Sequence, residues 1–134
     1  MKVLVCGPRK WMDQKPIEEV LRQFPVGTII VEGGARGADS IAGFVGEILG
    51  FEVREYPVDP ALDGPWPAAG VQRNLRMLKA EHPSSDGSYV DVGIAFKLRE
   101  QLSAGTGHMV EFMREATPRI EVREVLYRAG QRAR

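Results

Sequence analysis

The chain has 134 residues, of which 43% are hydrophobic, and its 18 Lys and Arg residues balance 18 Asp and Glu residues. This length suits one domain with a sizeable buried core, and the zero net charge excludes the strongly basic composition of proteins that live on nucleic acid or on anionic membranes. The single cysteine, Cys6, excludes a disulfide framework and a cysteine-rich zinc site.

The N-terminal apolar run, 3–6, is too short for a secretory signal and far too short to span a bilayer. We therefore expect a cytoplasmic protein without a membrane partner. His82 and His108 have no Cys or His companion at ligand spacing, so no metal site is expected. The fingerprints G-x-G-x-x-G and G-x-x-x-x-G-K-[ST] are both missing, so neither an NAD cofactor nor ATP hydrolysis is indicated.

The first half of the chain alternates apolar runs with helical patterns. The run 3–6 predicts a buried strand that stops at Gly7-Pro8, and Asp13 then caps a helix with apolar residues at helical spacing. The run 28–31 predicts a second strand, and the helix that follows it ends at Gly50.

The second half continues this alternation with weaker signals. Three further strands are predicted over 51–58, 89–96 and 120–125, and two further helices around 71–78 and after 103–108. A loop rich in Pro, Gly and Ala covers 57–70, and its length favours a functional or mobile segment.

Strands that alternate with helices at this spacing predict an α/β fold with right-handed βαβ units. We expect a single doubly wound, Rossmann-like domain over 1–127, followed by a basic tail over 128–134. Its five-stranded, mainly parallel sheet should have the order 3-2-1-4-5, with helices on both faces, because the first two strands are continuously apolar and the third and fifth are mixed.

Ligands of such sheets bind beyond the carboxyl ends of the strands, where the strand order reverses. Three strand ends run into glycine-containing segments that carry a fixed cation or a hydroxyl: Gly7 with Arg9, Gly33-Gly34 with Arg36 and Asp39, and Gly105-Thr106-Gly107. Glycine lets a ligand approach the backbone, helix N-termini attract anions, and Arg forks match phosphate oxygens. The sequence therefore predicts an anion site at this edge.

Several side chains near this edge have two interpretations. Trp11 and Trp66 either stack on a base or pack a loop onto the core. Asp39 abstracts a proton, binds a ribose hydroxyl or favours the positive end of its helix. Arg36 either binds phosphate or pairs with a nearby carboxylate to hold its loop. His108 is a general acid or base, or a solvated surface residue.

Four elements of the sequence resemble the YspA-like branch of the SLOG superfamily. Residues 7–11 are similar to its G-S-R-x-W/F element, and 33–39, GGARGAD, to its G-G-A-x-G-A-D motif. Arg73-Asn74 with Met77 resembles R-N-x-x-M, and Gly105-Thr106 resembles the G-T that opens its last major helix. The resemblance covers about residues 2–122.

The resemblance implies a Rossmann-like nucleotide-binding domain related to the DNA-processing protein DprA and to the LOG phosphoribohydrolases. By position, the residues that would line the pocket are Gly7, Arg9, Trp11, Gly33, Gly34, Arg36, Gly37, Asp39, Arg73, Asn74, Gly105, Thr106 and Gly107. The phosphoribohydrolases carry P-G-G-x-G-T-x-x-E, whereas here Met109 stands at the position of the glutamate.

Three functions follow from these patterns. The first is a module that binds a nucleotide or nucleotide-derived molecule, as a sensor or sequestering protein. The second is an N-glycosidase that acts on nucleoside monophosphates and uses a carboxylate such as Glu32, Asp39 or Glu111. The third is single-stranded DNA binding as in DprA, which the neutral charge disfavours despite Arg128, Arg132 and Arg134 in the tail. A homodimer is also expected, through an apolar face of Met109, Phe112 and Met113 together with Trp66.

Overall fold

Five parallel strands form one sheet in the computed structural model, which describes residues 1–128. The strands are β1 (Lys2–Cys6), β2 (Ile29–Glu32), β3 (Glu52–Glu55), β4 (Val92–Lys97) and β5 (Glu121–Leu126). Their order is β3-β2-β1-β4-β5, and each neighbouring pair is parallel. The α/β fold class and the strand order predicted from the sequence are confirmed.

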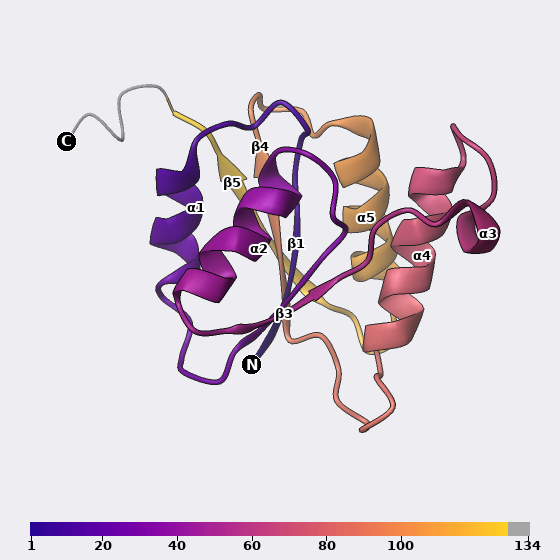
Figure 1. Cartoon of the computed structure of the whole chain (residues 1–134), viewed down its shortest axis with the longest axis horizontal. Coiled ribbons are helices and arrows are strands. Elements are labelled where there is room, and N and C mark those ends of the chain that lie inside the picture. The colour runs from indigo at the N-terminus through magenta and orange to yellow at the C-terminus, as the bar shows by residue number, and fades with distance from the viewer. Residues whose placement is uncertain (129–134) are drawn as a thin grey trace.

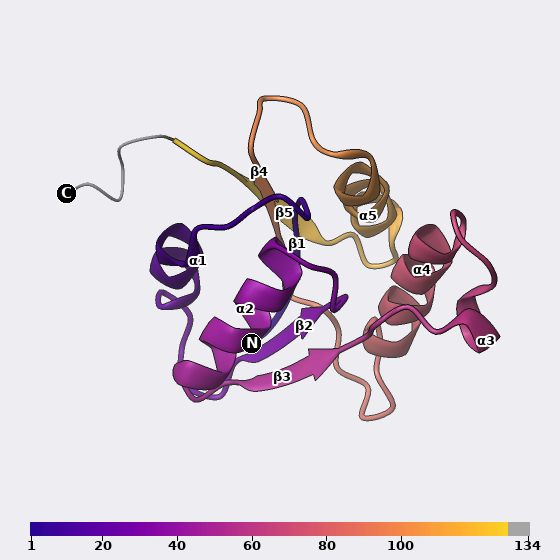
Figure 2. The same cartoon turned by 45° about the horizontal axis from the view of Figure 1, so that its top comes forward.

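Helices cover both faces of this sheet (Figures 1 and 2). They are α1 (Gln14–Leu21), α2 (Ala38–Ile48), α3 (Pro60–Asp63), α4 (Ala69–Glu81) and α5 (Ala104–Glu115). Figure 2 shows α1 and α2 on one side of the sheet and α4 and α5 on the other, with α3 beyond α4. The Asp13 side chain caps α1 by accepting a hydrogen bond from the Lys15 N–H, as predicted.

The core has two halves because successive side chains of a strand point to opposite faces. In β1, Val3 and Val5 pack toward α1 and α2, while Leu4 packs toward α4 and α5, and all three are fully buried. Met109 and Met113 of α5 are buried in the second half, as their helical spacing predicts. They therefore add no uncovered apolar face, and the homodimer that used this face stays a prediction.

The short helix α3 is absent from the elements predicted by sequence, because 57–70 reads as one long loop. Asp59 accepts a hydrogen bond from the Ala61 N–H at 3.0 Å, and Pro60 occupies the first helical position. An Asp-Pro pair is a helix-start signal, so this element was recoverable from the sequence.

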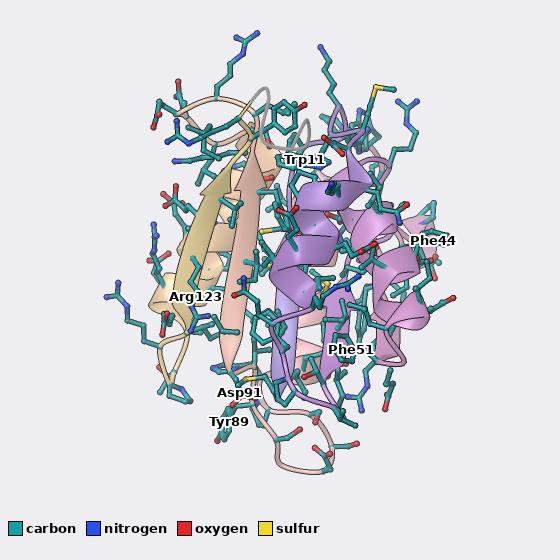
Figure 3. All side chains as sticks on the ribbon, turned by 90° about the vertical axis from the view of Figure 1, so that its left-hand side faces the viewer. Trp11, Phe44, Phe51, Tyr89, Asp91 and Arg123 are labelled. Carbon is teal, nitrogen blue, oxygen red and sulfur yellow. The ribbon has the colours of Figure 1, made fainter. Side chains whose placement is uncertain are left out.

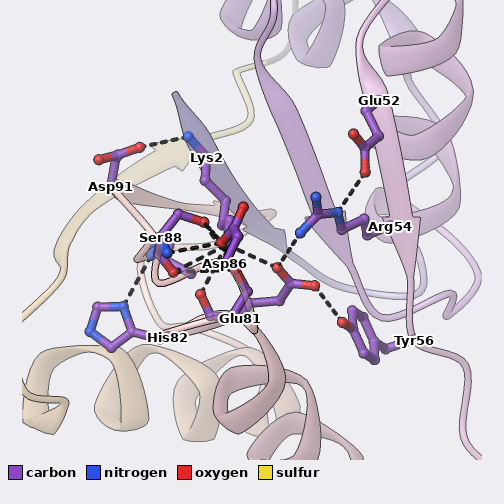
Figure 4. Close-up of polar contacts among 11 residues, drawn as sticks. Lys2, Glu52, Arg54, Tyr56, Glu81, His82, Asp86, Ser88 and Asp91 are labelled. Carbon is purple, nitrogen blue, oxygen red and sulfur yellow. Dashed lines mark hydrogen bonds and ion pairs between the residues drawn. The ribbon is translucent and has the colours of Figure 1, made fainter.

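A buried ion-pair network ties β1, β3 and α4 together (Figure 4). Lys2 Nζ lies 3.0 Å from Glu81 Oε1, both side chains are almost fully buried, and Arg54 Nη1 donates to the same oxygen at 2.9 Å. The Tyr56 hydroxyl donates to the other Glu81 oxygen. Such a fully partnered network fixes how α4 lies on the sheet, whereas removing one partner would leave a buried charge uncompensated.

The two edge strands carry short-range ion pairs of their own. Arg54 Nε lies 2.6 Å from Glu52 Oε2 on β3, and Arg123 Nε lies 2.8 Å from Glu121 Oε2 on β5. None of the described helices combines the length and apolar character needed to cross a bilayer. Most of the predicted basic tail, 129–134, lies outside the described residues.

Candidate functional site

The strand order reverses between β1 and β4, since α1 and α2 lie on one face and α4 and α5 on the other. In doubly wound sheets the crevice outside the carboxyl ends of such strands is the usual ligand site. The segments at this edge are 7–13 after β1, 33–37 after β2 and 98–103 after β4. Two of the three glycine-containing segments lie here, and the third opens α5.

The loops after β1 and β2 are in direct contact because two glycines permit it. A Cβ on Gly37 would lie 2.4 Å from the Pro8 carbonyl oxygen, and Gly37 has a φ of +83°. A Cβ on Gly7 would lie 2.5 Å from the Cβ of Ala38. The Pro8 carbonyl also accepts the Ala38 N–H at 3.2 Å. Close packing between loop and helix therefore explains both glycines.

Asp39, in the first turn of α2, organises the loop after β2. It is 6% exposed, its Oδ2 accepts the Gly33 N–H at 3.2 Å, and the N–H groups of Ala35 and Gly7 also stabilise it. Burial raises the pKa of Asp39 to about 6, although the Arg73 charge and these N–H donors act to lower it. The carboxylate is therefore ionised at neutral pH and holds two loops in place.

Arg73 and Asn74 on α4 face inward and reach the same loops. The Arg73 guanidinium donates to the Gly33 carbonyl and, at 3.2 Å, to the Tyr56 carbonyl, while its Nε donates to Asn74 Oδ1 at 3.0 Å. Asn74 Nδ2 donates to the Gly105 carbonyl at 3.4 Å. A Cβ on Gly33 would lie 2.7 Å from the Arg73 guanidinium carbon, so a side chain there would displace this guanidinium. These two predicted site residues join the edge loops to α5.

The amino end of α5 presents accessible backbone. A Cβ on Gly105 or Gly107 would meet no atom within 4 Å, whereas Thr106 is 4% exposed and its Oγ1 accepts the Ser103 hydroxyl at 2.8 Å. Ser103, the N-cap residue, makes no side-chain cap bond to the helix. The first N–H groups of a helix lack intrahelical partners, so this end offers donors to an anion.

Four cations of the edge segments have no carboxylate partner within residues 1–128, and the predicted site residues among them are Arg9 and Arg36, alongside Lys10 and Arg99. Arg36 is exposed and makes no hydrogen bond or ion pair there, so the pairing with Glu32 or Asp39 that the sequence left open does not occur. Arg9 is exposed too, and its guanidinium carbon lies 4.9 Å from the centre of the Trp66 ring. Arg73 differs from both because Asp39 balances its charge.

The two tryptophans have different environments. Trp11 is 1% exposed, its ring packs against Phe96 and Tyr127 at centroid distances of 5.2 and 5.3 Å, and its Nε1 donates to the Asp13 carbonyl at 2.6 Å. Of the two roles that the sequence leaves open for Trp11, packing is the one this environment supports. Trp66 is 64% exposed.

Two clefts of the described chain flank this cluster of predicted residues. One, of about 480 Å³, is lined by Lys10, Trp11, Met12, Asp13, Leu98 and Tyr127. The other, of about 340 Å³, is lined by Glu32, Ser40, Gly43, Phe44, Glu47, Val53 and Glu55. Trp11 is the predicted ligand-binding residue among these linings, and Glu32 is a candidate carboxylate of the N-glycosidase hypothesis. The predicted arginines and glycines line neither cleft.

Sequence reasoning missed two acidic residues near the edge. Asp63 is 4% exposed, and Arg76 Nε on α4 donates to its Oδ1 at 2.8 Å, which fixes α3 against α4 just before Trp66. Glu55, at the end of β3, contacts the loop after β2, since a Cβ on Gly34 would lie 3.1 Å from its Cγ. Glu32 and Glu55 are register partners at the ends of the parallel strands β2 and β3, so they lie side by side. Aligning the two predicted strand ends could have identified this pair.

A comparison with known proteins finds the Gene 61 protein of Mycobacterium phage D29, which is 36% identical over 124 residues, covering 86% of this chain and 87% of the phage protein. The chain belongs to the family of this phage protein. No protein-family model matches the chain, and no solved structure matches it. In this Gene 61 family member, the arrangement of side chains described above is therefore the basis for inferring function.

Proposed function

We propose that this protein binds a nucleotide or a nucleotide-derived molecule at the carboxyl edge of its sheet, as a sensor or sequestering module, in line with the nucleotide binding that its resemblance to the SLOG superfamily implies. The observation that carries the proposal is the pair of exposed arginines, Arg9 and Arg36, on two touching loops without carboxylate partners among residues 1–128. Unpaired guanidinium groups suit a phosphate, and so do the N–H groups at the open amino end of α5.

The Trp66 ring offers a surface on which the base could stack. The ring is mostly exposed, and Arg9 lies over it, which links the aromatic surface to one of the two cations. Nucleobases stack on exposed aromatic rings, and cation–π contact with Arg adds to such stacking. In the proposed complex the phosphate meets Arg36 and the amino end of α5, and the base meets Trp66.

The positions of the carboxylates support binding over N-glycosidic cleavage. Asp39 accepts backbone N–H groups and Glu32 accepts the Gly34 N–H, so each has a role in holding a loop. Glu111 is exposed on α5, and Met109, at the position of the hydrolase glutamate, is 1% exposed. Single-stranded DNA binding gains no support from the edge, and Arg132 and Arg134 of the tail lie outside the described residues.

Calorimetric titration of the protein with the four nucleoside 5′-monophosphates, the matching nucleosides and ribose 5-phosphate tests the proposal. We expect saturable binding of at least one monophosphate and much weaker binding of its nucleoside. Trp66→Ala should weaken binding of that monophosphate by about 1–3 kcal/mol, the value of a base–aromatic stack, and leave ribose 5-phosphate affinity unchanged.

Chromatography of the same mixtures distinguishes the alternative. Recovery of intact nucleotide after long incubation agrees with binding, whereas release of free base would establish the N-glycosidase function. The proposal is wrong if none of the monophosphates binds saturably.

A further inference from the structure

A second candidate site lies beside the proposed nucleotide edge, in the cleft of about 340 Å³ between α2 and β3. Ser40, Gly43, Phe44 and Glu47 line it from α2 at positions i, i+3, i+4 and i+7, which form one stripe of the helix. Val53 and Glu55 line it from β3, and Glu32 lies at its base. Figure 3 shows Phe44 on the outer side of α2, and this side chain is 54% exposed.

The charge of this cleft is one-sided. Its lining, all within the described chain, contains three carboxyl groups and no Lys, Arg or His. Glu32 is fully buried, and its Oε1 accepts the Gly34 N–H. Its Oε2 accepts no hydrogen bond from any N–H or O–H of residues 1–128. A buried carboxylate oxygen without a hydrogen-bond donor destabilises the folded protein. Glu32 Oε2 is therefore an atom that a ligand with a donor group could satisfy.

Gly43 of α2 packs directly against that oxygen at the wall of the cleft. A Cβ at position 43 would lie only 2.7 Å from Glu32 Oε2, so glycine there lets α2 lie close to the buried carboxyl. The Glu55 carboxyl is within hydrogen-bond reach of Glu32, and two carboxyl groups form such a bond only when they share a proton. A cationic donor that enters the cleft beside the exposed Glu55 would satisfy both carboxylates at once.

The charged groups around Glu32 favour a positive ligand. Burial, followed by the neighbouring Glu55 of β3 and Asp39 of α2, raises the pKa of Glu32 to about 9. Glu47 adds a fourth acidic group along α2, and Arg73 is the cation that acts on Glu32 from α4. Glu32 in the free cleft therefore carries a proton at neutral pH. An ammonium group bound beside Glu32 would displace this proton.

We propose that this cleft binds an alkyl diammonium, with one ammonium between Glu32 and Glu55, the other beside Glu47, and the methylene chain against Phe44 and Val53. Glu47 lies one turn beyond Gly43, a rise of about 6 Å along the helix axis, which a spacer of about four methylenes spans. The proposal stands on its own, because none of these residues belongs to the proposed nucleotide site.

The test is calorimetric titration of the full chain with putrescine, the four-carbon diammonium. We expect one saturable site per chain, about tenfold or more weaker binding of n-butylammonium, which lacks the second charge, and no binding of neutral 1,4-butanediol. In buffers with different ionisation enthalpies at pH 7, binding should release close to one proton, because the ligand ionises Glu32.

Three variants make the test specific. Glu32→Gln keeps the shape of the protonated side chain, and it should abolish the proton release and weaken putrescine binding by about tenfold or more. Glu47→Gln, at an exposed position that folding does not require, should reduce putrescine affinity to that of n-butylammonium. Glu115→Gln removes one exposed carboxylate from α5, on the other face of the sheet, and should change nothing. The proposal is overturned if putrescine does not bind saturably, or if Glu115→Gln weakens it as much as Glu47→Gln.

Discussion

Arg36 and Arg73 lie at the same edge of the sheet, but Arg73 is buried and hydrogen-bonded, whereas Arg36 is exposed. Arg73 is 7% exposed and donates to the Gly33 and Tyr56 carbonyls, so its charge and its hydrogen bonds hold loops together. Arg36 is exposed and has no partner among residues 1–128. An exposed cation without a partner contributes little to folding, so its charge is free to serve a ligand.

Arg36→Ala should weaken binding of the preferred nucleoside monophosphate by about 1.5–3 kcal/mol, the range for hydrogen bonds to charged groups. The melting temperature of the free protein should stay the same, because the substitution breaks no contact. Arg119→Ala is the matched control, since Arg119 is exposed in the loop before β5, at the opposite end of the strands. Unchanged nucleotide affinity together with a lowered melting temperature would remove Arg36 from the site.

The sequence predicted which residue types gather at this edge but not how they divide their roles. Its glycine and arginine positions identified the edge because strand ends and helix starts are readable from local pattern. The inward direction of Arg73 and Asn74 depends on how α4 packs, and the exposure of Trp66 depends on α3. These long-range contacts leave no periodic signal, and the same limit applies to the cleft around Glu32.

At the scale of elements, the strands were predicted to within about three residues at each end, because continuous apolar runs are typical of a covered parallel sheet. The Asp63–Arg76 pair, which docks α3 onto α4, joins residues with no shared pattern, so it could not be inferred. The loops at the edge of the sheet contain glycines with very different surroundings. Gly37 is crowded by the loop after β1, whereas Gly105 has open space around it.

The substitutions Gly37→Ala and Gly105→Ala should therefore have opposite effects on stability. Gly37 has a φ of +83° and no room for a Cβ, so alanine there should cost at least about 1–3 kcal/mol of unfolding free energy. Gly105 lies in the first turn of α5 with open space around its Cα, so alanine should be neutral or stabilise by up to about 1 kcal/mol.

Urea denaturation of both variants measures the difference. Equal destabilisation by the two alanines would contradict the assigned packing of the two loops.

At the scale of the whole molecule, the pH dependence of folding should follow Glu32. Its pKa rises from 4.5 to about 9 on folding, so between these values the folded protein keeps a proton that the unfolded chain has lost. Unfolding then releases a proton, and the free energy of unfolding falls as the pH rises through this window. The pKa of Asp39 is raised to about 6, so Asp39 also lowers the free energy of unfolding as the pH rises, but at lower pH than Glu32.

Urea unfolding at pH 6, 7, 8 and 9 should therefore show steadily declining stability for the natural chain. Glu32→Gln, which carries no titratable group, should flatten this decline, and Glu115→Gln should preserve it. A slope that is the same in Glu32→Gln as in the natural chain would show that Glu32 is ionised in the folded protein.

The acid–base pairs on β3 and β5 bear on how copies of the molecule stay apart. With zero net charge, one copy does not repel another at long range, so colloidal stability has to come from local features. An open sheet is most vulnerable to aggregation along its two border strands, where a neighbouring chain can add by strand pairing. The pairs Glu52–Arg54 and Glu121–Arg123 place both signs of charge on each border, so an incoming strand must desolvate them. The two charged pairs therefore disfavour strand pairing between copies at either border of the sheet.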